Sequence, residues 1–366
     1  MKKLKVIVSG GGTGGHIFPA IAIAKSLENK VSDIELLFVG AKDRMEMQKV
    51  PEAGYKIEGL WISGFQRSFS SRNLMFPFKL ISSVIKSMKI VRRFKPDLVI
   101  GTGGFASGPL LFAASRKGIP SVIQEQNSYA GITNKLLSKY VNKVCVAYDN
   151  MERFFPKDKI IFTGNPIRKV ILNFKDKRKE GKKIFGVNNG KITILVVGGS
   201  LGARTINESI KESISEFANN DLNLIWQTGT SFGDVAKNII EDINIDGISS
   251  HMFIREMDLA YAAADIIVSR AGAIAISELC FVAKPILLVP SPNVAEDHQT
   301  QNAQSLVNKN SALMVKDVDA KRKLVSELIS LSRNKDLQGV LSSNIQKLSV
   351  DNASVKIVDL ALNLIE

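Results

Sequence analysis

Three glycine-rich stretches of this sequence could hold a phosphate or another anion. Residues 9–16 read SGGGTGGH, residues 101–109 read GTGGFASGP and residues 198–204 read GGSLGAR; each follows a short apolar run. Glycine permits positive φ and lets backbone N–H groups approach a ligand closely, and a helix that begins there favours negative charge. Such loops occur at nucleotide sites, sugar sites and purely structural turns, so alone they specify none of these.

The spacing of the first loop also matches a dinucleotide fingerprint. Gly10, Gly12 and Gly15 satisfy G-x-G-x-x-G, but that fingerprint needs an acidic residue at the end of the second strand to hold a ribose. Here the second strand, residues 34–39, is followed by Gly-Ala-Lys, and the chain has no Walker lysine. A nicotinamide enzyme is therefore disfavoured.

Two further residues have types and settings that suit a nucleotide. Residues 271–278 (AGAIAISE) predict a glycine turn that enters a helix, whose first N–H groups suit a diphosphate. Glu278 follows about two turns later, with acceptor oxygens that could hold both ribose hydroxyls or serve only as a surface charge. Arg168 has a fork that suits a phosphate, or it is a simple ion-pair residue of a linker.

Two residues are candidate catalytic bases. His16 stands where the first glycine loop becomes a helix, and it either deprotonates an acceptor, contacts a diphosphate or braces the turn. Glu125 either acts as a base or orders the loop that follows it. His298 could share the role of its neighbour Gln299, whereas His251 belongs to no motif and is interpreted as structural. No metal role is assigned to the Asp-Val-Asp sequence at residues 317–319, since it lies far from these motifs.

The alternation of strand-like and helical segments predicts an α/β protein with two doubly wound parallel-sheet domains in tandem. Apolar runs of strand length alternate with helical stretches, and a strand–glycine–helix opening occurs twice. We expect domains at residues 1–165 and 166–349, with a terminal helix at about 350–366 that packs back on the first. Glycine loops from both domains would then line an interdomain cleft. The lysine-rich run at 175–183 (KDKRKEGKK) is predicted to be a solvated loop.

The positive charge of the chain is concentrated in its first half. Residues 1–165 contain 25 Lys and Arg against 12 Asp and Glu, whereas residues 166–366 contain 24 against 23. Residues 59–96 have no acidic residue, and basic side chains alternate there with large apolar ones: Arg67, Arg72, Lys79, Lys86, Lys89, Arg92, Arg93 and Lys95. This pattern predicts contact with an anionic membrane surface, chiefly through residues 74–78 and a few neighbours. Nucleic acid fits less well, because no recognition motif is present.

Cysteine content and hydropathy indicate a reducing compartment and no membrane span. The two cysteines lie in apolar contexts typical of buried free thiols, and no stretch of about 18 apolar residues occurs. The apolar run after the first lysines is too short for a secretory signal. We expect a cytoplasmic protein that binds the membrane peripherally.

Seven motifs together resemble the MurG family of glycosyltransferases. In chain order they are GGGTGGHIFPA, GTGGFASGP, QEQNSYAGITNK, GNPIR, VVGGSLGAR, SRAGAIAISE and EDHQTQNA, and the resemblance covers essentially the whole chain. It implies the GT-B architecture, in which two Rossmann-like domains face a cleft. It also implies an inverting transfer of N-acetylglucosamine from UDP-N-acetylglucosamine to an undecaprenyl-diphospho-muramoylpentapeptide, without a cofactor, in peptidoglycan synthesis.

The resemblance assigns roles to individual residues. Implied contacts to UDP-N-acetylglucosamine are Thr13, Gly14, Gly15, Asn127, Arg168, Ser200, Ile254, Ala273, Ile274, Ala275, Ile276, Ser277, Glu278 and Gln299. Gly103, Gly104 and Phe105 are implied on the acceptor side, where Phe105 replaces a tyrosine found in many relatives and lacks its hydroxyl. Implied partners are the sugar nucleotide, the lipid acceptor, the cytoplasmic face of the cell membrane, and other cell-wall synthesis or division proteins.

Two other functions remain open. One is a different enzyme of the same fold that acts on UDP-N-acetylglucosamine, such as a 2-epimerase or a glycolipid synthase; three histidines are few for an epimerase. The other is a non-catalytic scaffold that binds a nucleotide sugar or a membrane, although such a scaffold could lose Asn127, Glu278 and Gln299, which are all present.

Overall fold

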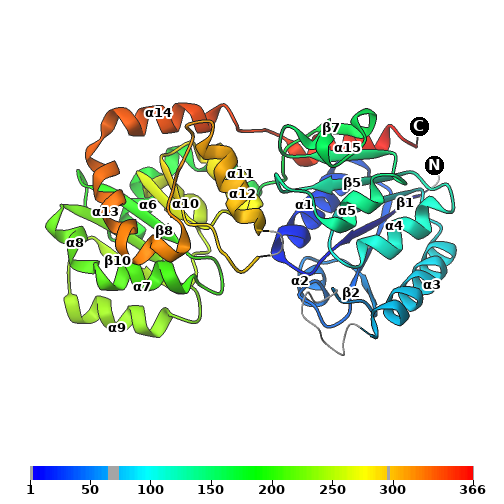
Figure 1. The fold of residues 1–366 in the computed structure, drawn as a ribbon, viewed down its shortest axis with the longest axis horizontal. Coiled ribbons are helices and arrows are strands. Elements are labelled where there is room, and N and C mark those ends of the chain that lie inside the picture. Colours follow the sequence, from blue (N-terminus) through cyan, green and yellow to red (C-terminus); the bar gives the residue numbers. More distant parts are fainter. Residues whose placement is uncertain (1–2, 65–73, 295–296, 366) are drawn as a thin grey trace. The chain divides into compact units, whose positions relative to one another are not determined.

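The chain forms two compact units, each built on its own parallel sheet (Figure 1). In this computed structural model the described residues are 3–64, 74–294 and 297–365. The first unit comprises Met1–Ile167 together with Asp351–Glu366, and the second comprises Arg168–Val350. None of the helices in the described ranges combines the length and apolar character needed to cross a bilayer.

The sheet of the first unit has the strand order β3-β2-β1-β4-β5-β6-β7 over the described residues, with every neighbouring pair parallel. Its strands are β1 (Leu4–Gly10), β2 (Ile34–Ala41), β3 (Ile57–Leu60), β4 (Leu98–Gly103), β5 (Ser121–Glu125), β6 (Lys143–Val146) and β7 (Ile160–Phe162). The order reverses direction between β1 and β4. Ligands of doubly wound sheets bind outside the carboxyl ends of strands at such a reversal.

Helices cover both faces of this sheet, which is why its strands read as continuous apolar runs. Alternate residues of β1 belong to different cores: Val6 and Val8 pack with α1 and α15, whereas Ile7 packs on the opposite face. The helices are α1 (Gly14–Lys30), α2 (Glu46–Glu52), α3 (Phe76–Phe94), α4 (Ser107–Ser115), α5 (Ile132–Leu137) and α15 (Ala353–Leu362). Figure 1 shows the last of these, α15, beside α1, where Ile357 and Val358 are fully buried.

The sheet of the second unit repeats this plan with the order β10-β9-β8-β11-β12-β13. Its strands are β8 (Ile192–Val197), β9 (Leu222–Gln227), β10 (Ile248–His251), β11 (Ile266–Ser269), β12 (Ile286–Leu288) and β13 (Leu313–Met314). The reversal lies between β8 and β11. The loops that follow these two strands therefore mark the expected ligand position of this unit.

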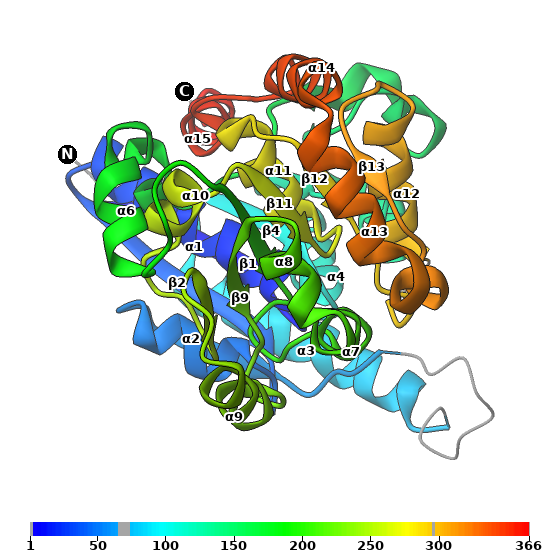
Figure 2. The same ribbon diagram turned by 90° about the vertical axis from the view of Figure 1, so that its left-hand side faces the viewer.

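One buried core of the second unit includes Trp226 and Phe217, and other buried side chains, such as Leu195 and Leu279, lie outside it. The helices of this unit are α6 (Arg178–Ile184), α7 (Arg204–Glu212), α8 (Ile214–Asn219), α9 (Gly233–Ile243), α10 (Met257–Ala263), α11 (Ala273–Val282), α12 (His298–Val307), α13 (Ala320–Arg333) and α14 (Lys335–Gln346). Figure 2 shows α13 beside α7, and these two helices are joined by ion pairs from Lys321 to Glu208 and Glu212.

The prediction of a solvated loop at residues 175–183 is wrong, because most of this run forms helix α6. The helix packs closely against α10, since a Cβ atom at Gly181 would lie 2.3 Å from the carbonyl oxygen of Leu259. Lys177 pairs with the buried Asp258 at 2.6 Å. Tertiary packing thus stabilises a helix in a segment whose composition is typical of solvent-exposed loops.

Candidate functional site

The first two glycine loops of unit one meet backbone to backbone at the reversal of the sheet. Gly11 donates its N–H to the carbonyl oxygen of Gly103 at 3.3 Å, so the β1–α1 loop pairs with the β4–α4 loop. Gly104 has φ +91°, and a Cβ atom there would lie 2.3 Å from the carbonyl oxygen of Gly11. Only glycine can satisfy both the backbone conformation and the close approach. The predicted acceptor-side residues Gly103 and Gly104 therefore shape the first loop directly.

His16 is held by this pair of loops. Its Nδ1 lies 3.1 Å from the carbonyl oxygen of Gly11 and 3.3 Å from Oγ1 of Thr13. Because a carbonyl oxygen only accepts, the contact with Gly11 requires a proton on Nδ1, and in a neutral ring Nε2 is then the basic nitrogen. The ring lies over Gly103, where a Cβ atom would come within 2.8 Å of it. The imidazole is thus braced in a tautomer that suits a base.

Thr13, Gly14 and Gly15 form the start of helix α1. Thr13 is the extended N-cap, and its carbonyl accepts the N–H groups of His16 and Ile17 at 3.1 Å. Its side chain makes no capping bond, and the first turn has no acidic residue. The first amides of α1 and the positive end of its dipole therefore suit an anion, as expected from the glycine pattern.

Glu46 positions the same loop, and sequence reasoning missed this residue. This fully buried carboxylate on α2 accepts the N–H of Gly12 and the N–H of Ala41, each at 2.9 Å. It thereby ties the end of β2 to the glycine loop after β1. Glu46 is one of two acidic residues that closely follow the second strand, the other being Asp43, and the sequence spacing did not indicate its hydrogen-bond partners.

Glu125 orders the loop after β5. Its carboxylate accepts the N–H of Asn127 at 3.1 Å, the N–H of Gly131 at 3.0 Å and the side-chain amide of Asn134 at 2.9 Å. The side chain is buried, and Asn127 also directs its own amide nitrogen to Glu125. Of the two roles open for Glu125, these bonds favour loop ordering over proton transfer, because both carboxylate oxygens are engaged by N–H donors of the loop.

Phe105 covers the first loop. Its ring lies against Gly64, where a Cβ atom would come within 2.3 Å of the ring, and it reaches toward Gly12. About two-fifths of Phe105 remains exposed. The aromatic ring supplies an apolar wall at this edge of the sheet.

In the second unit, the loop after β8 is a tight turn stabilised by glycine. Gly199 and Gly202 have φ of +87° and +89°, and Gly202 donates its N–H to the carbonyl of Gly199 at 3.1 Å. Ser200 is exposed, and its carbonyl accepts the N–H of Thr230 at 3.2 Å. The Ser200 hydroxyl is therefore presented to solvent by a loop of defined shape.

Helix α11 begins at the other side of the reversal, with open amides. Gly272 is an extended N-cap, no side chain caps the helix, and its first turn has no acidic residue. Ala273, Ile274 and Ala275 supply the first N–H groups, whereas the N–H of Ile276 donates to the carbonyl of Gly272 at 2.9 Å. The Ser277 hydroxyl donates back to the carbonyl of Ala273 at 3.0 Å. Such an end suits a diphosphate.

Glu278 and Arg168 form a bidentate ion pair. Nε and Nη2 of Arg168 each donate to a different oxygen of Glu278 at 2.6 Å. The Glu278 side chain is 3% exposed, and Tyr261 is also buried. Burial and the neighbouring carboxylate raise the pKa of Tyr261, and the hydrogen bond to Glu278 raises the pKa of Arg168. The structure thus brings together Arg168 and Glu278, which the sequence considered separately, and adds Tyr261.

Two residues that were predicted to contact UDP-N-acetylglucosamine make hydrogen bonds to other residues of the second unit. The N–H of the buried Ile254 donates to Oε1 of Gln227 at 3.0 Å. Oε1 of Gln299 accepts the N–H of Ser291 at 2.9 Å. Gln227 was not selected from the sequence; its place at the end of β9 is the only signal. Any ligand bond from the Ile254 N–H would replace this contact.

The acidic pair at 317–319 is engaged in ion pairs. Asp317 pairs with Arg270 and accepts the hydroxyl of Thr205 at 2.8 Å, and Asp319 pairs with Arg322 at 3.0 Å. In residues 3–64, 74–294 and 297–365 no three His, Cys, Asp or Glu side chains cluster as metal ligands. His251 packs edge-on against Phe185, with ring centroids 5.2 Å apart.

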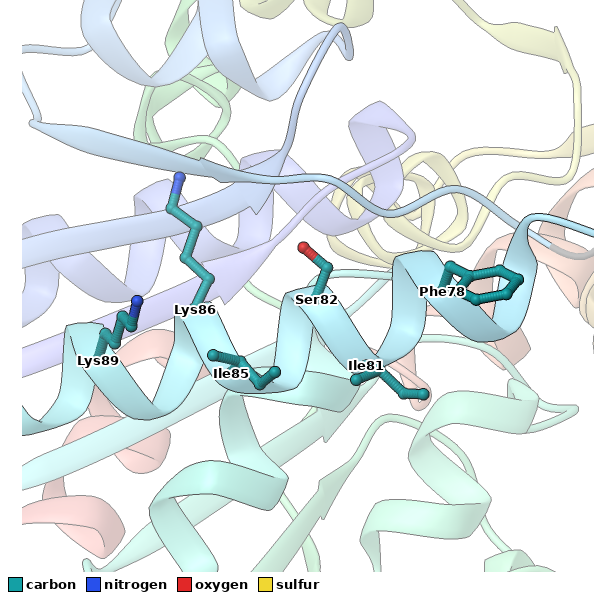
Figure 3. A pocket seen from close by; sticks show the side chains of 6 residues that line it. All are labelled: Phe78, Ile81, Ser82, Ile85, Lys86 and Lys89. Atoms are coloured by element: carbon teal, nitrogen blue, oxygen red, sulfur yellow. The ribbon is translucent and has the colours of Figure 1, made fainter.

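Helix α3 presents an apolar outer face. Figure 3 shows a shallow hollow on it, lined by Phe78, Ile81, Ser82, Ile85, Lys86 and Lys89. The exposed apolar side chains extend further along the chain than residues 74–78: they are Leu74, Met75, Phe78, Leu80, Ile81, Ile85 and Met88. Lys86 and Lys79 turn inward, donating to the Gly59 carbonyl and the Ser63 hydroxyl at 2.7 and 3.0 Å. Arg67 and Arg72 lie outside the described residues.

The chain matches two profiles of one enzyme family. The glycosyltransferase family 28 N-terminal domain matches residues 6–146, and the glycosyltransferase family 28 C-terminal domain matches residues 193–356. The first profile falls within the first unit, and the second covers most of the second unit and extends into residues 351–356 of the first. The chain therefore has the two Rossmann-like units of the GT-B fold.

Similar proteins extend this match over the full length. The chain is 54% identical to a protein of Flavobacterium psychrophilum and 53% identical to one of Cytophaga hutchinsonii, covering 100% of this chain and 99% and 98% of theirs. Both are named UDP-N-acetylglucosamine–N-acetylmuramyl-(pentapeptide) pyrophosphoryl-undecaprenol N-acetylglucosamine transferase. The crystal structure of Acinetobacter baumannii MurG superposes with a TM-score of 0.80 at 28% identity, over 99% of this chain and 100% of that one. The chain belongs to glycosyltransferase family 28 and, within it, to the MurG family.

Proposed function

We propose that the chain transfers N-acetylglucosamine from UDP-N-acetylglucosamine to the 4-hydroxyl of an undecaprenyl-diphospho-muramoylpentapeptide. The observation that carries the proposal is the full-length identity of 54% to a relative named for this transfer. The geometry of the second unit agrees with a nucleotide donor. An uncapped helix N-terminus, a buried carboxylate at Glu278 and a guanidinium at Arg168 offer groups for a diphosphate and a ribose.

The two units divide the work in this proposal. The second unit binds the donor through α11, the Ser200 loop, Ile254, Gln299, Arg168 and Glu278. The first unit contributes the amides of Thr13, Gly14 and Gly15, the side chain of Asn127, and the acceptor-side residues Gly103, Gly104 and Phe105. The glycine loops and the starts of α1 and α11 directly follow strands of their own sheets, at the usual ligand position in this architecture.

The proposed reaction is a single inverting displacement. The 4-hydroxyl of the acceptor attacks the anomeric carbon while UDP departs, and the hydroxyl proton passes to Nε2 of His16. Negative charge grows on the departing diphosphate. Amides at the start of α11 and the guanidinium of Arg168 stabilise that charge, and no enzyme nucleophile and no metal ion take part.

A coupled assay tests this function. Purified protein is incubated with UDP-N-acetylglucosamine and a lipid-linked muramoyl pentapeptide, and both UDP and a disaccharide lipid are expected. Addition of a chelator is expected to leave turnover unchanged, and loss of turnover with a chelator that magnesium restores contradicts the metal-free mechanism. UDP release without acceptor, or free N-acetylmannosamine, indicates a 2-epimerase instead.

We also propose that the first unit binds the cytoplasmic face of the membrane through the outer face of α3. Phe78, Ile81 and Ile85 are each at least half exposed, and basic side chains lie along the same helix (Figure 3). Apolar side chains can enter the headgroup region, and each nearby Lys or Arg adds about 1 kcal/mol at an anionic surface. This surface would bring the enzyme to a lipid-linked acceptor.

Vesicle binding tests the membrane proposal. Sedimentation with phosphatidylcholine vesicles, with and without phosphatidylglycerol, is compared for the wild type and for Phe78→Ser and Ile81→Ser. Binding is expected only with phosphatidylglycerol and is expected to fall in both variants. Val318→Ser is the control, because Val318 is 83% exposed but belongs to the second unit. Equal binding by all four proteins would remove the role of α3.

A further inference from the structure

The carboxylate of Glu278 is largely occupied in the absence of any ligand. Its two oxygens offer about four lone-pair positions. Nε and Nη2 of Arg168 take one position on each oxygen at 2.6 Å, and the Glu278 side chain is only 3% exposed. A ribose diol needs two positions on the same carboxylate. Because so little of Glu278 is exposed while the guanidinium lies against it, the diol and the complete guanidinium fork compete for this carboxylate.

The two partners of this ion pair differ in freedom. Glu278 lies in helix α11 with a side chain only 3% exposed. Arg168 precedes the short helix at Lys169–Asn173 in extended conformation, and its side chain is 44% exposed. When a ligand reaches this carboxylate, the guanidinium is the group that can move. Its charge would then be released to bond to another anion.

We propose that Arg168 is a positioning residue that exchanges between Glu278 and the diphosphate of the donor. In the donor-free chain it occupies the carboxylate. When the ribose hydroxyls bind Glu278, the guanidinium leaves and bonds to the diphosphate. Recognition of the ribose is thereby coupled to clamping of the leaving group. The inference rests on the proposed donor, a nucleoside diphosphate sugar.

The exchange makes an unusual prediction for ligands that lack phosphate. Uridine must displace Arg168 from Glu278 without offering the guanidinium a new anionic partner. Removal of Arg168 should therefore strengthen uridine binding, by about three- to tenfold for a half-exposed ion pair. UDP loses a phosphate contact in the same variant and should bind more weakly than to the wild type. If the guanidinium only contacted phosphate, removal of Arg168 would leave the affinity for uridine unchanged. If it only braced Glu278, removal of Arg168 would lower that affinity.

Calorimetry on Arg168→Ala and Arg168→Gln tests the exchange. Affinities for uridine and UDP are measured for both variants, for the wild type and for the control Arg178→Ala. Arg178 has the same 44% side-chain exposure and pairs with Asp265 at 2.7 Å, away from α11. Tighter uridine binding together with weaker UDP binding in the Arg168 variants supports the exchange. Unchanged or weaker uridine binding in a folded Arg168 variant overturns it.

A measurement on the wild type covers the case in which the Arg168 variants do not fold. In protein with ¹⁵N-labelled arginine, the Nε resonance of Arg168 is expected to shift with uridine but not with 2′,3′-dideoxyuridine. Through-bond correlation of the side chain with the backbone in the wild-type protein assigns the resonance. No shift with uridine, or the same shift with both nucleosides, overturns the proposal.

The outcomes also separate this inference from the proposed function. If wild-type protein forms the disaccharide lipid but its Arg168 resonance does not shift with uridine, the proposed function stands and the exchange is contradicted. Wild-type protein that binds neither uridine nor UDP contradicts both.

Discussion

The carboxylate of Glu46 accepts the backbone N–H of Gly12 at 2.9 Å, so a helix after the second strand holds the glycine loop after the first. The other oxygen accepts the N–H of Ala41 at the same distance. One buried side chain thus satisfies two backbone donors from separate strands. This arrangement places the first amides of α1 where an anion can reach them.

Glu46→Ala is expected to lower the free energy of unfolding by about 2–4 kcal/mol, because two buried N–H groups lose their acceptor. Urea unfolding measures this change, and the transferase assay is expected to show a loss of activity as the loop relaxes. Glu52→Ala is the control on the same helix, since Glu52 is exposed and pairs only with Lys49. Equal stability of the two variants would show that the loop does not depend on Glu46.

Gly104→Ala and Gly54→Ala separate backbone strain from close packing. Their φ values are +91° and +92°, but a Cβ atom at Gly104 meets the Gly11 carbonyl at 2.3 Å, whereas none lies within 4 Å at Gly54. Both variants should lose about 1–2 kcal/mol from the left-handed conformation. Only Gly104→Ala should displace the first loop and abolish transfer. Similar activity in both variants would contradict a role for the contact between the loops.

His16→Ala is expected to lower kcat for transfer by about 10²–10⁴-fold, the usual contribution of a positioned base. The affinity for UDP should change little, because the imidazole acts on the acceptor hydroxyl. The assignment of Nδ1–H to the Gly11 carbonyl predicts that turnover depends on a neutral ring and falls at acid pH. A variant with unchanged kcat but weaker UDP binding would assign His16 to the diphosphate.

His251 gives a pH dependence of stability that is separate from catalysis. Burial against Phe185 lowers the pKa of His251 below its ordinary value of 6.5. As pH falls through about 6.5 the unfolded chain binds a proton before the folded chain does, so the free energy of unfolding decreases. Urea unfolding of the wild type at several pH values between about 7.5 and 5.5 should show this decrease, and His251→Gln should show a smaller one. Parallel pH profiles would exclude His251 as the cause.

Much of the fold could be predicted from local patterns. The runs before Gly10 and Gly198 are apolar and strand-length, and each is followed by glycine and a helical stretch, so two doubly wound units follow from the chain itself. The run at 175–183 was wrongly predicted to be a loop, because its charged side chains indicate only that one side of the segment faces solvent. Its packing against α10 depends on Gly181 and on residues far along the chain.

The sequence alone determined which residue types stand at the ends of the strands, because periodicity and glycine spacing are local properties of the chain. Tertiary structure decided which of those groups pair. Arg168 and Glu278 are 110 positions apart, and their bidentate contact exists only because α11 buries the carboxylate beside the segment that carries Arg168. Glu46 likewise finds Gly12 through the packing of α2 against the sheet. A buried carboxylate must be satisfied by whichever donors the fold brings to it, and no spacing rule along the chain identifies them.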